Sequence, residues 1–219
     1  MKNTKQVLSN KFNTDMKDHC FHYEKIDTPH IVIYKWENGI AYKAPYKCLH
    51  KQMDNLMMID TFIKNKFKIK NKRGEYYLFA NEMHDYVVDD LEIRELTLQD
   101  EFLLERMMDA CRPEESSLAQ ITIHDIHVLG GFIKGELVGL SSILDLWGAY
   151  DIGIITHPNF RKRGVSSALV AGNAKWVLAQ NKICMYRCDE DNLGSYKTAL
   201  KLSFEKTVDV IIYELEKEV

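Results

Sequence analysis

The sequence predicts an α/β fold in which helices cover the faces of a mixed β-sheet. Short runs rich in β-branched and aromatic residues alternate along the chain with longer runs whose apolar residues recur every three or four positions. Some of the predicted strands are joined by tight turns and others through a helix, so antiparallel and parallel neighbours are both expected. With 219 residues, of which 46% are hydrophobic, the chain can bury a substantial core.

Two domains are expected, a smaller α+β domain over residues 1–90 and a larger domain over residues 91–219. In the first, HIVIYKWENGIAYKA (30–44) predicts a hairpin, because Asn38-Gly39 tolerates the positive φ angles of a tight turn. Apolar spacing predicts a helix within residues 50–67, and EYYLFA (75–80) predicts another strand. We identify no catalytic group of residues in this half.

Residues 91–219 predict strands and helices in the order β-α-β-β-β-α-β-α-β. Thr97 is expected to cap the first helix, with Asp100 in its first turn, and Gly135 lies in the turn of a second hairpin. The predicted strands are 91–96, 126–133, 137–144, 151–156, 182–188 and 207–215, and the predicted helices are 98–112, the segment after Gly164, and 192–204.

Charge and composition argue against several classes of protein. The 29 Lys and Arg residues are outnumbered by 32 Asp and Glu residues, so no global positive field favours nucleic acid as the main partner. No apolar run approaches the roughly 20 residues that span a bilayer, so no membrane partner is expected. The five cysteines lack framework spacing, and the start MKNTKQVLSNKFN has no apolar leader. We therefore expect a reduced, cytoplasmic protein.

Residues 156–170, THPNFRKRGVSSALV, have the features of an anion-binding turn. Pro158 ends a strand, and Gly164 permits a positive φ angle where the chain enters a helix. The first N–H groups of that helix lack internal acceptors and carry the positive end of its dipole. Cations and hydroxyl donors that suit a phosphate are Arg161, Lys162, Arg163, Ser166 and Ser167. The alternative is an ordinary surface turn with solvated cations.

The stretch RKRGVS resembles the R/Q-x-x-G-x-G/A signature of the GNAT superfamily of acetyl-CoA-dependent N-acetyltransferases. Neighbouring stretches agree in order. ITHP precedes the signature as a family strand ending does, FIKGELVGLSSI looks like the family's hairpin, and NLGSYKTALKLSF resembles its later helix. The resemblance covers roughly residues 91–219 and implies the family's mixed, splayed central sheet. A Walker-type nucleotide loop and a dinucleotide fingerprint are both absent from the sequence.

The resemblance implies acetyl-CoA as co-substrate and acetyl transfer to a primary amine of a small molecule or peptide, by direct attack in a ternary complex. In the family, the splayed strand pairs with the pantetheine amides, the signature loop holds the pyrophosphate, and the later helix contacts the pantetheine arm. The matching cofactor-binding residues are Ile154, Ile155 and Thr156 on the strand, Arg161, Lys162, Arg163, Gly164, Val165, Ser166 and Ser167 in the loop, and Asn192 and Ser195 on the helix.

Three positions depart from the family's pattern. Ser166 stands where Gly or Ala is usual, and Ser203 replaces a glycine, but neither side chain is bulky. Ala199 occupies the position at which many members carry the tyrosine that protonates the leaving thiolate, so that acid is unassigned. A non-catalytic acyl-CoA-binding or regulatory module therefore stays open as the alternative. A homodimer is also left open, and the first half is a candidate for a reduced GNAT-like companion domain.

Asp151 is the candidate catalytic base. An ammonium group must lose a proton before it can attack a thioester, and the family uses a carboxylate or ordered waters, often at the start of the splayed strand. Asp151 occupies that place in this sequence. The alternative is a solvated aspartate at the turn of an edge strand.

No metal site is expected from the remaining clusters. His19, Cys20 and His22 form one short group without a second pair of ligands. His124 and His127 are interpreted as structural or substrate-adjacent. Cys184 and Cys188 lie four apart on a predicted strand and are interpreted as core thiols, too far apart for a disulfide.

Overall fold

The structure is a computed structural model and describes residues 2–14, 16, 21–37, 39–45, 47–49, 53 and 55–216. The chain forms two compact units. The first unit contains Met1–Leu78, Arg187–Leu193 and Lys206–Val219, and the second contains Phe79–Tyr186 and Gly194–Glu205. The first unit therefore combines residues from both sides of the boundary that the sequence suggested at residue 90.

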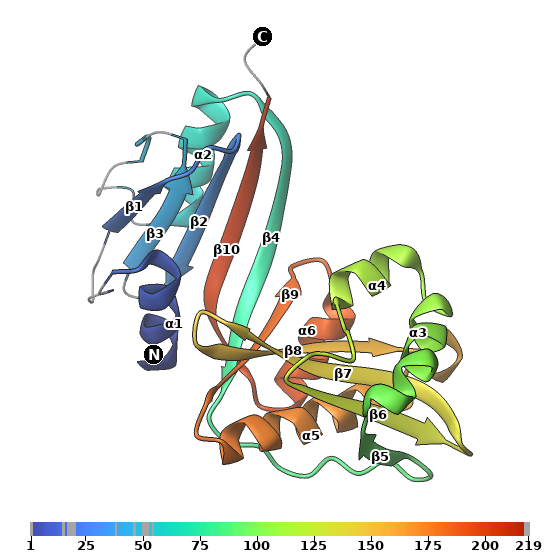
Figure 1. The fold of residues 1–219 in the computed structure, drawn as a ribbon. Coiled ribbons are helices and arrows are strands. Elements are labelled where there is room, and N and C mark those ends of the chain that lie inside the picture. Colours follow the sequence, from blue (N-terminus) through green and yellow to red (C-terminus); the bar gives the residue numbers. More distant parts are fainter. Residues whose placement is uncertain are drawn as a thin grey trace. The chain divides into compact units, whose positions relative to one another are not determined.

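The first unit is built on strands that pair across long sequence separations. Its elements are α1 (Lys2–Phe12), β1 (Phe21–Lys25), β2 (His30–Trp36), β3 (Gly39–Ala44), α2 (Leu56–Lys66), β4 (Ile69–Ala80) and β10 (Glu205–Leu215). The strands lie in the order β1-β3-β2-β10-β4 (Figure 1). β2 and β3 are antiparallel, which confirms the predicted hairpin, although Asn38 itself lies outside the described residues. β10 also runs antiparallel to β2.

The helix α2 confirms the predicted helical segment of this unit. It begins after Asn55, whose side chain accepts a hydrogen bond from the N–H of Met58 and so caps the helix. Ile59 and Ile63, one turn apart, are buried and join a core cluster that includes Tyr213 of β10. β4 is longer than predicted, because it begins at residue 69 rather than 75.

The second unit contains the other strands and helices. They are β5 (Glu92–Glu95), β6 (His127–Ile133), β7 (Glu136–Leu146), β8 (Ala149–Thr156) and β9 (Ile183–Asp189, to Tyr186 in this unit), with η1 (Leu98–Asp100), α3 (Glu101–Asp109), α4 (Pro113–Ala119), η2 (Pro158–Phe160), α5 (Val165–Ala179) and α6 (Leu193–Lys201, from Gly194 in this unit). The strand order is β9-β8-β7-β6-β5, in which β5 to β8 are antiparallel neighbours and β8 and β9 are parallel. The predicted mixed α/β fold is confirmed.

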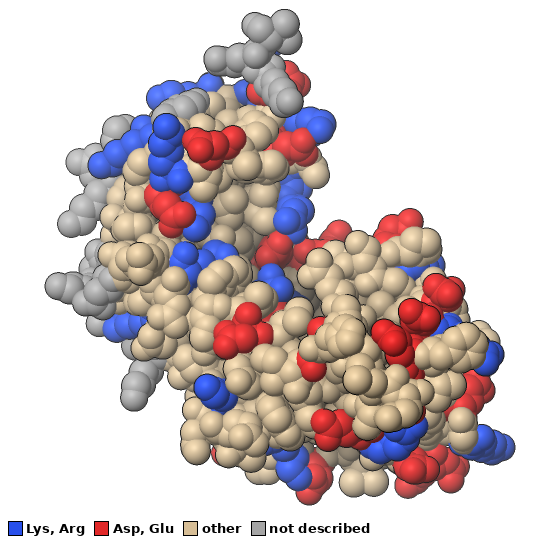
Figure 2. Space-filling model, viewed as in Figure 1, with Lys and Arg blue, Asp and Glu red and all other residues tan. Residues whose placement is uncertain are grey.

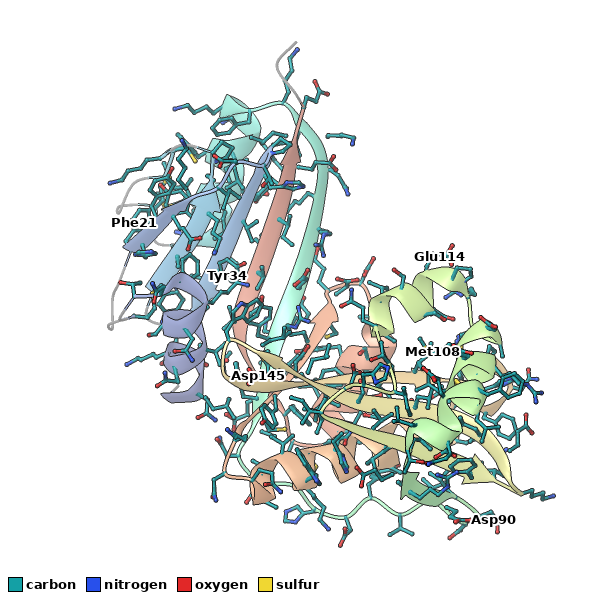
Figure 3. All side chains as sticks on the ribbon, viewed as in Figure 1. Phe21, Tyr34, Asp90, Met108, Glu114 and Asp145 are labelled. Atoms are coloured by element: carbon teal, nitrogen blue, oxygen red, sulfur yellow. The ribbon has the colours of Figure 1, made fainter. Side chains whose placement is uncertain are left out.

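Helices cover both faces of the sheet in this unit. Neighbouring side chains along β8 point to opposite faces. Ile154 packs with Leu169 on the face of α5, whereas Ile155 packs with Leu104 on the face of α3. Met108 of α3, labelled in Figure 3, packs against the same cluster as Ile155. A Cβ on Gly153 would lie 3.0 Å from the carbonyl oxygen of Ala119, so α4 covers this second face as well.

The prediction of a single helix over residues 98–112 is wrong in the length of the helix and in the number of helical segments. Thr97 is the N-cap residue at its start, as predicted, and its N–H donates to the Asp100 carboxylate at 2.9 Å, as in a capping box. The chain then forms η1 and α3, and a separate helix α4 begins at Pro113. Proline suits the first turn of a helix but disfavours helical φ/ψ in the residue before it, and Arg112 is extended, with φ -68° and ψ 142°.

Candidate functional site

Strands β8 and β9 separate partway along β8. Their register runs from Ala149 opposite Ile183 to Asp151 opposite Met185, whereas β8 stays paired with β7 as far as Thr156. In the described part of the chain, β8 therefore has no β9 partner after Asp151. Backbone groups on that edge are available to an extended ligand, because a strand edge leaves N–H and C=O groups unpaired.

A buried polar network holds the separated part of β8. Ser141 Oγ donates to the carbonyl of Gly153 at 2.8 Å, and Asn173 Nδ2 donates to Ser141 Oγ at 2.8 Å. The other amide atom of Asn173 lies 2.8 Å from Nδ1 of His127, whose ring stacks on Trp176 at 4.5 Å. Asn173 is fully buried, so these bonds satisfy polar groups that water does not reach. The interpretation of His127 as structural agrees with this position.

The predicted turn before α5 has the backbone geometry that requires glycine. Gly164 has a φ of 85° and precedes the first residue of α5, Val165, which is buried in the sheet-facing cluster. A Cβ on Gly164 would lie 3.0 Å from Val88 and 3.3 Å from Tyr86. The turn therefore leaves no room for a side chain at Gly164, and the first residues of α5, Val165 to Ser167, line a pocket that suits an oxyanion.

A pocket of about 220 Å³ opens at this turn, entirely within the second unit. Six of the residues that the sequence proposed for cofactor binding contribute to it. Two lysines of α6, which the sequence did not single out, form part of its wall. The lining residues are Thr156, Phe160, Lys162, Gly164, Val165, Ser166, Ser167, Lys197, Thr198 and Lys201.

The lysines of this pocket lack acidic partners. The described part of the chain places no carboxylate within ion-pair distance of Lys162 or Lys197, and the described contact of Lys201 Nζ is with the neutral phenol of Tyr86, with the ring centroid 4.5 Å away. An ammonium group can only donate hydrogen bonds. Three positive charges are thus gathered in one pocket without neutralisation, which indicates a ligand with several negative charges.

The two arginines of the predicted loop are engaged elsewhere and are not among the lining residues. Arg161 pairs with Glu115 of α4 at 2.8 Å, and its Nε donates to the carbonyl of Thr156 at 3.3 Å. Hydrogen bonds from Arg112 and Arg161 lower the pKa of Glu115 to about 2. Arg163 lies over the ring of Phe160 at 5.3 Å. Arg161 therefore ties the end of β8 to α4.

The remaining predicted residues are not among those that line the pocket. The side chains of Ile154 and Ile155 pack into the two core clusters, so only their backbone groups are offered to a ligand. Ser195 Oγ lies 2.6 Å from the hydroxyl of Tyr186 in the second unit. Asn192 belongs to the first unit, where its N–H donates to the carbonyl of Asp189 at 3.1 Å.

Asp151 lies at the point where β8 and β9 separate. It is the last β8 residue in register with β9, and it is 7% exposed. Because residues two apart on a strand share a face, Asp151 lies on the same face as Ile155, the face covered by α3 and α4. Burial and, to a smaller extent, the nearby charge of Asp151 raise the pKa of Cys184 to about 12. Cys184 and Cys188 are both buried, as core thiols are.

The described residues contain no group of three or more His, Cys, Asp or Glu side chains arranged to hold a metal ion. Of the short cluster near residue 20, His19 and Cys20 lie outside the described residues, and His22 packs its ring against Phe12. Within the same described ranges, no helix has the length and apolarity needed to cross a bilayer.

A mixed sheet with two separating parallel strands, followed by a glycine turn and a helix that begins at the pocket, is the architecture of the GNAT fold. The chain belongs to the acetyltransferase (GNAT) family, whose sequence model matches residues 91–204. A comparison with curated proteins gives no match.

Solved structures share this fold at low sequence identity. A GCN5-related N-acetyltransferase from Sphaerobacter thermophilus aligns with a TM-score of 0.57 and 12% identity, over 72% of this chain and 55% of that chain. A GNAT acetyltransferase from Colwellia psychrerythraea gives 0.56 and 12%, over 72% and 61%. A GNAT-family acetyltransferase from Novosphingobium aromaticivorans gives 0.54 and 14%, over 68% of each chain. These similarities show the fold.

Proposed function

We propose that this protein transfers the acetyl group of acetyl-CoA to a primary amine of a small molecule or peptide. The family supports acetyl transfer in general. The observation that carries the choice of co-substrate is the pocket at the start of α5, where no carboxylate of the described residues pairs with Lys162, Lys197 or Lys201. The pyrophosphate of coenzyme A would accept hydrogen bonds from the first N–H groups of α5, and the three lysines would together balance the negative charge of the phosphate groups of coenzyme A.

The edge of β8 would align the rest of the co-substrate. Pantetheine is an extended chain with two amides, and it would pair with backbone groups of Ile154 to Thr156 much as an added strand does. The thioester would then lie farther back along β8, towards Asp151. A backbone N–H of Ile154 or Ile155 would donate to the thioester oxygen as negative charge develops on it.

Asp151 would act as the base. It would accept a proton from the substrate ammonium, and the freed amine would attack the thioester carbon to form a C–N bond. The C–S bond then breaks, the thiolate of coenzyme A leaves, and the nitrogen of the new amide gives up its second proton to water. A free thiol has a pKa of about 8.5, so a thiolate is a good leaving group and can take its proton from water. This matters because Ala199, at the position of the family's tyrosine, is buried and has no proton to give.

The surface near Asp151 favours a positively charged acceptor. Figure 2 shows acidic side chains over α3 and α4, the helices that cover the face of the sheet on which Asp151 lies. Four exposed carboxylates there, those of Glu101, Glu105, Asp109 and Glu114, outnumber the exposed guanidinium groups of Arg106 and Arg112. Such a field would attract an ammonium group and repel an anion.

A second candidate is a non-catalytic module that binds acyl-CoA, which the buried Ala199 favours. One experiment separates the two. Acetyl-CoA is incubated with the protein and a panel of primary amines, comprising polyamines, aminoglycosides, amino acids and peptide N-termini, and released thiol is measured. Thiol release that depends on an amine supports the transferase. Binding of coenzyme A with no amine-dependent release across the panel supports the module, and absence of binding removes both candidates.

A further inference from the structure

A segment that precedes the family match reaches the phosphate pocket. Residues 81–90 join β4 to β5 in an extended path beside α5 (Figure 1). Asp85 pairs with Lys175 of α5, and Val88 lies against the turn, 3.0 Å from where a Cβ on Gly164 would be. The segment is therefore fixed along α5 by an ion pair at one point and by packing at another.

Tyr86 is the residue of this segment that contacts two lining residues of the pocket. Its ring lies 3.3 Å from the position of a Cβ on Gly164, its hydroxyl contacts Lys201 Nζ, and the ammonium lies 4.5 Å from the ring centroid. Because an ammonium has no acceptor, Lys201 donates to the phenol oxygen, and Tyr86 keeps its own proton to donate. The partner is neutral, so Lys201 is held in place while its charge remains available to a ligand.

The pocket has more positive charge than a pyrophosphate alone would engage. The start of α5 and Lys162 form one wall. Lys197 and Lys201, four residues apart and so on one face of α6, form another. Coenzyme A carries a further anionic group, the phosphate monoester on its ribose, which is close to dianionic near neutral pH. Two ammonium groups from one face of α6 match such a group in charge.

We propose that Tyr86 is a specificity-determining residue that positions Lys201 beside Lys197, so that the pair binds the ribose phosphate of coenzyme A. The inference rests on the proposed coenzyme A site. Tyr86 acts through Lys201 and contacts the turn from outside the residues that match the family. A lysine whose long side chain is already ordered in the free protein loses less conformational entropy when the ligand binds.

The test compares coenzyme A with 3′-dephospho-coenzyme A, which lacks only the ribose phosphate. Dissociation constants are measured by calorimetry for the wild type, Tyr86→Leu, Lys201→Met and the double variant. Each single substitution is expected to reduce the preference for coenzyme A by about tenfold, because a hydrogen bond to a charged group is lost. The double variant should prefer coenzyme A over 3′-dephospho-coenzyme A at least as much as Lys201→Met alone does, because the two residues act as a unit.

A matched control comes from the first unit, where Lys206 Nζ also lies 4.5 Å from a tyrosine ring, that of Tyr76. Tyr76→Leu removes the same kind of contact at residues that do not line the pocket and should leave the preference unchanged. Tyr86→Phe keeps the ring and removes only the oxygen, so it should fold as the wild type does and lose part of the preference, about threefold.

The outcomes separate this inference from the proposed function. Suppose that the wild type binds coenzyme A but that Lys201→Met and Tyr86→Phe lower the affinity for both ligands by the same factor. The lysines then serve the pyrophosphate, and the inference is overturned. An unchanged preference in both variants overturns it as well. If the wild type binds neither ligand, the proposed function itself fails, and the inference fails with it.

Discussion

Two lysines of the first unit, Lys64 and Lys72, and the lysines of the phosphate pocket are arranged in opposite ways. In the first unit, Lys64 and Lys72 both pair with the carboxylate of Asp60, at 2.7 and 2.8 Å. In the second unit, Lys162 and Lys197 lie in a pocket where no described carboxylate pairs with them. The first arrangement neutralises charge within the protein, and the second leaves charge for something outside it.

Scarcity of acidic residues does not explain the difference. The chain has 32 Asp and Glu against 29 Lys and Arg, so carboxylates are in excess. Uncompensated ammonium groups in one pocket raise the free energy of the empty protein by mutual repulsion. They are therefore best explained by a ligand whose negative charge replaces the missing carboxylates.

Obstruction of the glycine turn should have the largest effect. Gly164→Val forces a side chain against Val88 and Tyr86 and strains the backbone turn, with its φ of 85°, that orients the first N–H groups of α5, so we expect coenzyme A affinity to fall by roughly 100-fold or more. Gly135→Val is the matched control, because Gly135 has a similar φ of 78° but open space around it. Calorimetry with coenzyme A measures both. Normal binding by Gly164→Val in a folded protein would show that the turn does not hold phosphate.

Removal of the proposed base should have the next largest effect, on turnover rather than on affinity. Asp151→Asn keeps the size of the side chain but cannot accept a proton, so turnover should fall by roughly 100-fold with little change in coenzyme A affinity. Asp145→Asn, on β7 of the same unit, is the control and should leave turnover near that of the wild type. The rate is measured against pH for each protein. An acidic limb that persists unchanged in Asp151→Asn excludes this residue as the base.

Single pocket lysines should contribute less. Lys162→Ala and Lys197→Ala are each expected to weaken coenzyme A binding by about tenfold, because each removes one charge-assisted contact to phosphate. The loss should shrink at high salt, which screens exposed charges. Lys64→Ala, in the first unit, should leave affinity unchanged. Equal effects of the three substitutions would mean that the pocket is not distinguished by its charge.

The sequence predicted the elements that local patterns specify. The turns at 38–39 and 135, the helix after Gly164 and the strands of the second half all carry turn residues or clear periodicity. α1 and β1 were missed. α1 has the mostly polar sequence KNTKQVLSNKF, and its burial of Val7 and Leu8 comes from tertiary packing, which no local pattern reveals. The break before α4 was missed although Pro113 signals it.

The candidate site was predicted only where it is continuous in sequence. The turn at 161–167 carries its own signal, but Lys197 and Lys201 meet it through the fold. A weak signal for them exists, since the neighbours of Lys197 four residues away are Leu193 and Lys201, neither of which can form an ion pair with it. The pairing of Arg161 with Glu115 was not foreseeable, because it depends on the position of α4.

The smallest effect should be on stability, at the carboxylate that neutralises two lysines of the first unit. Burial alone would raise the pKa of Asp60, but hydrogen bonds from Lys64, Lys72 and Tyr213 outweigh it and lower that pKa well below its usual range. A depressed carboxyl pKa means that the stabilisation is present above the unfolded value of about 3.9 and is lost as the pH falls through the folded value. Asp60→Asn should therefore cost about 1 kcal/mol of unfolding free energy at pH 7 and less as the pH falls below about 4.

Urea denaturation of the wild type and Asp60→Asn between pH 3 and pH 7 measures the difference. Asp209→Asn, which removes a partner of Lys206 on β10, serves as the control at a more exposed carboxylate. If Asp60→Asn costs the same at every pH, its ion pairs do not stabilise the first unit and the contrast with the pocket lysines is lost.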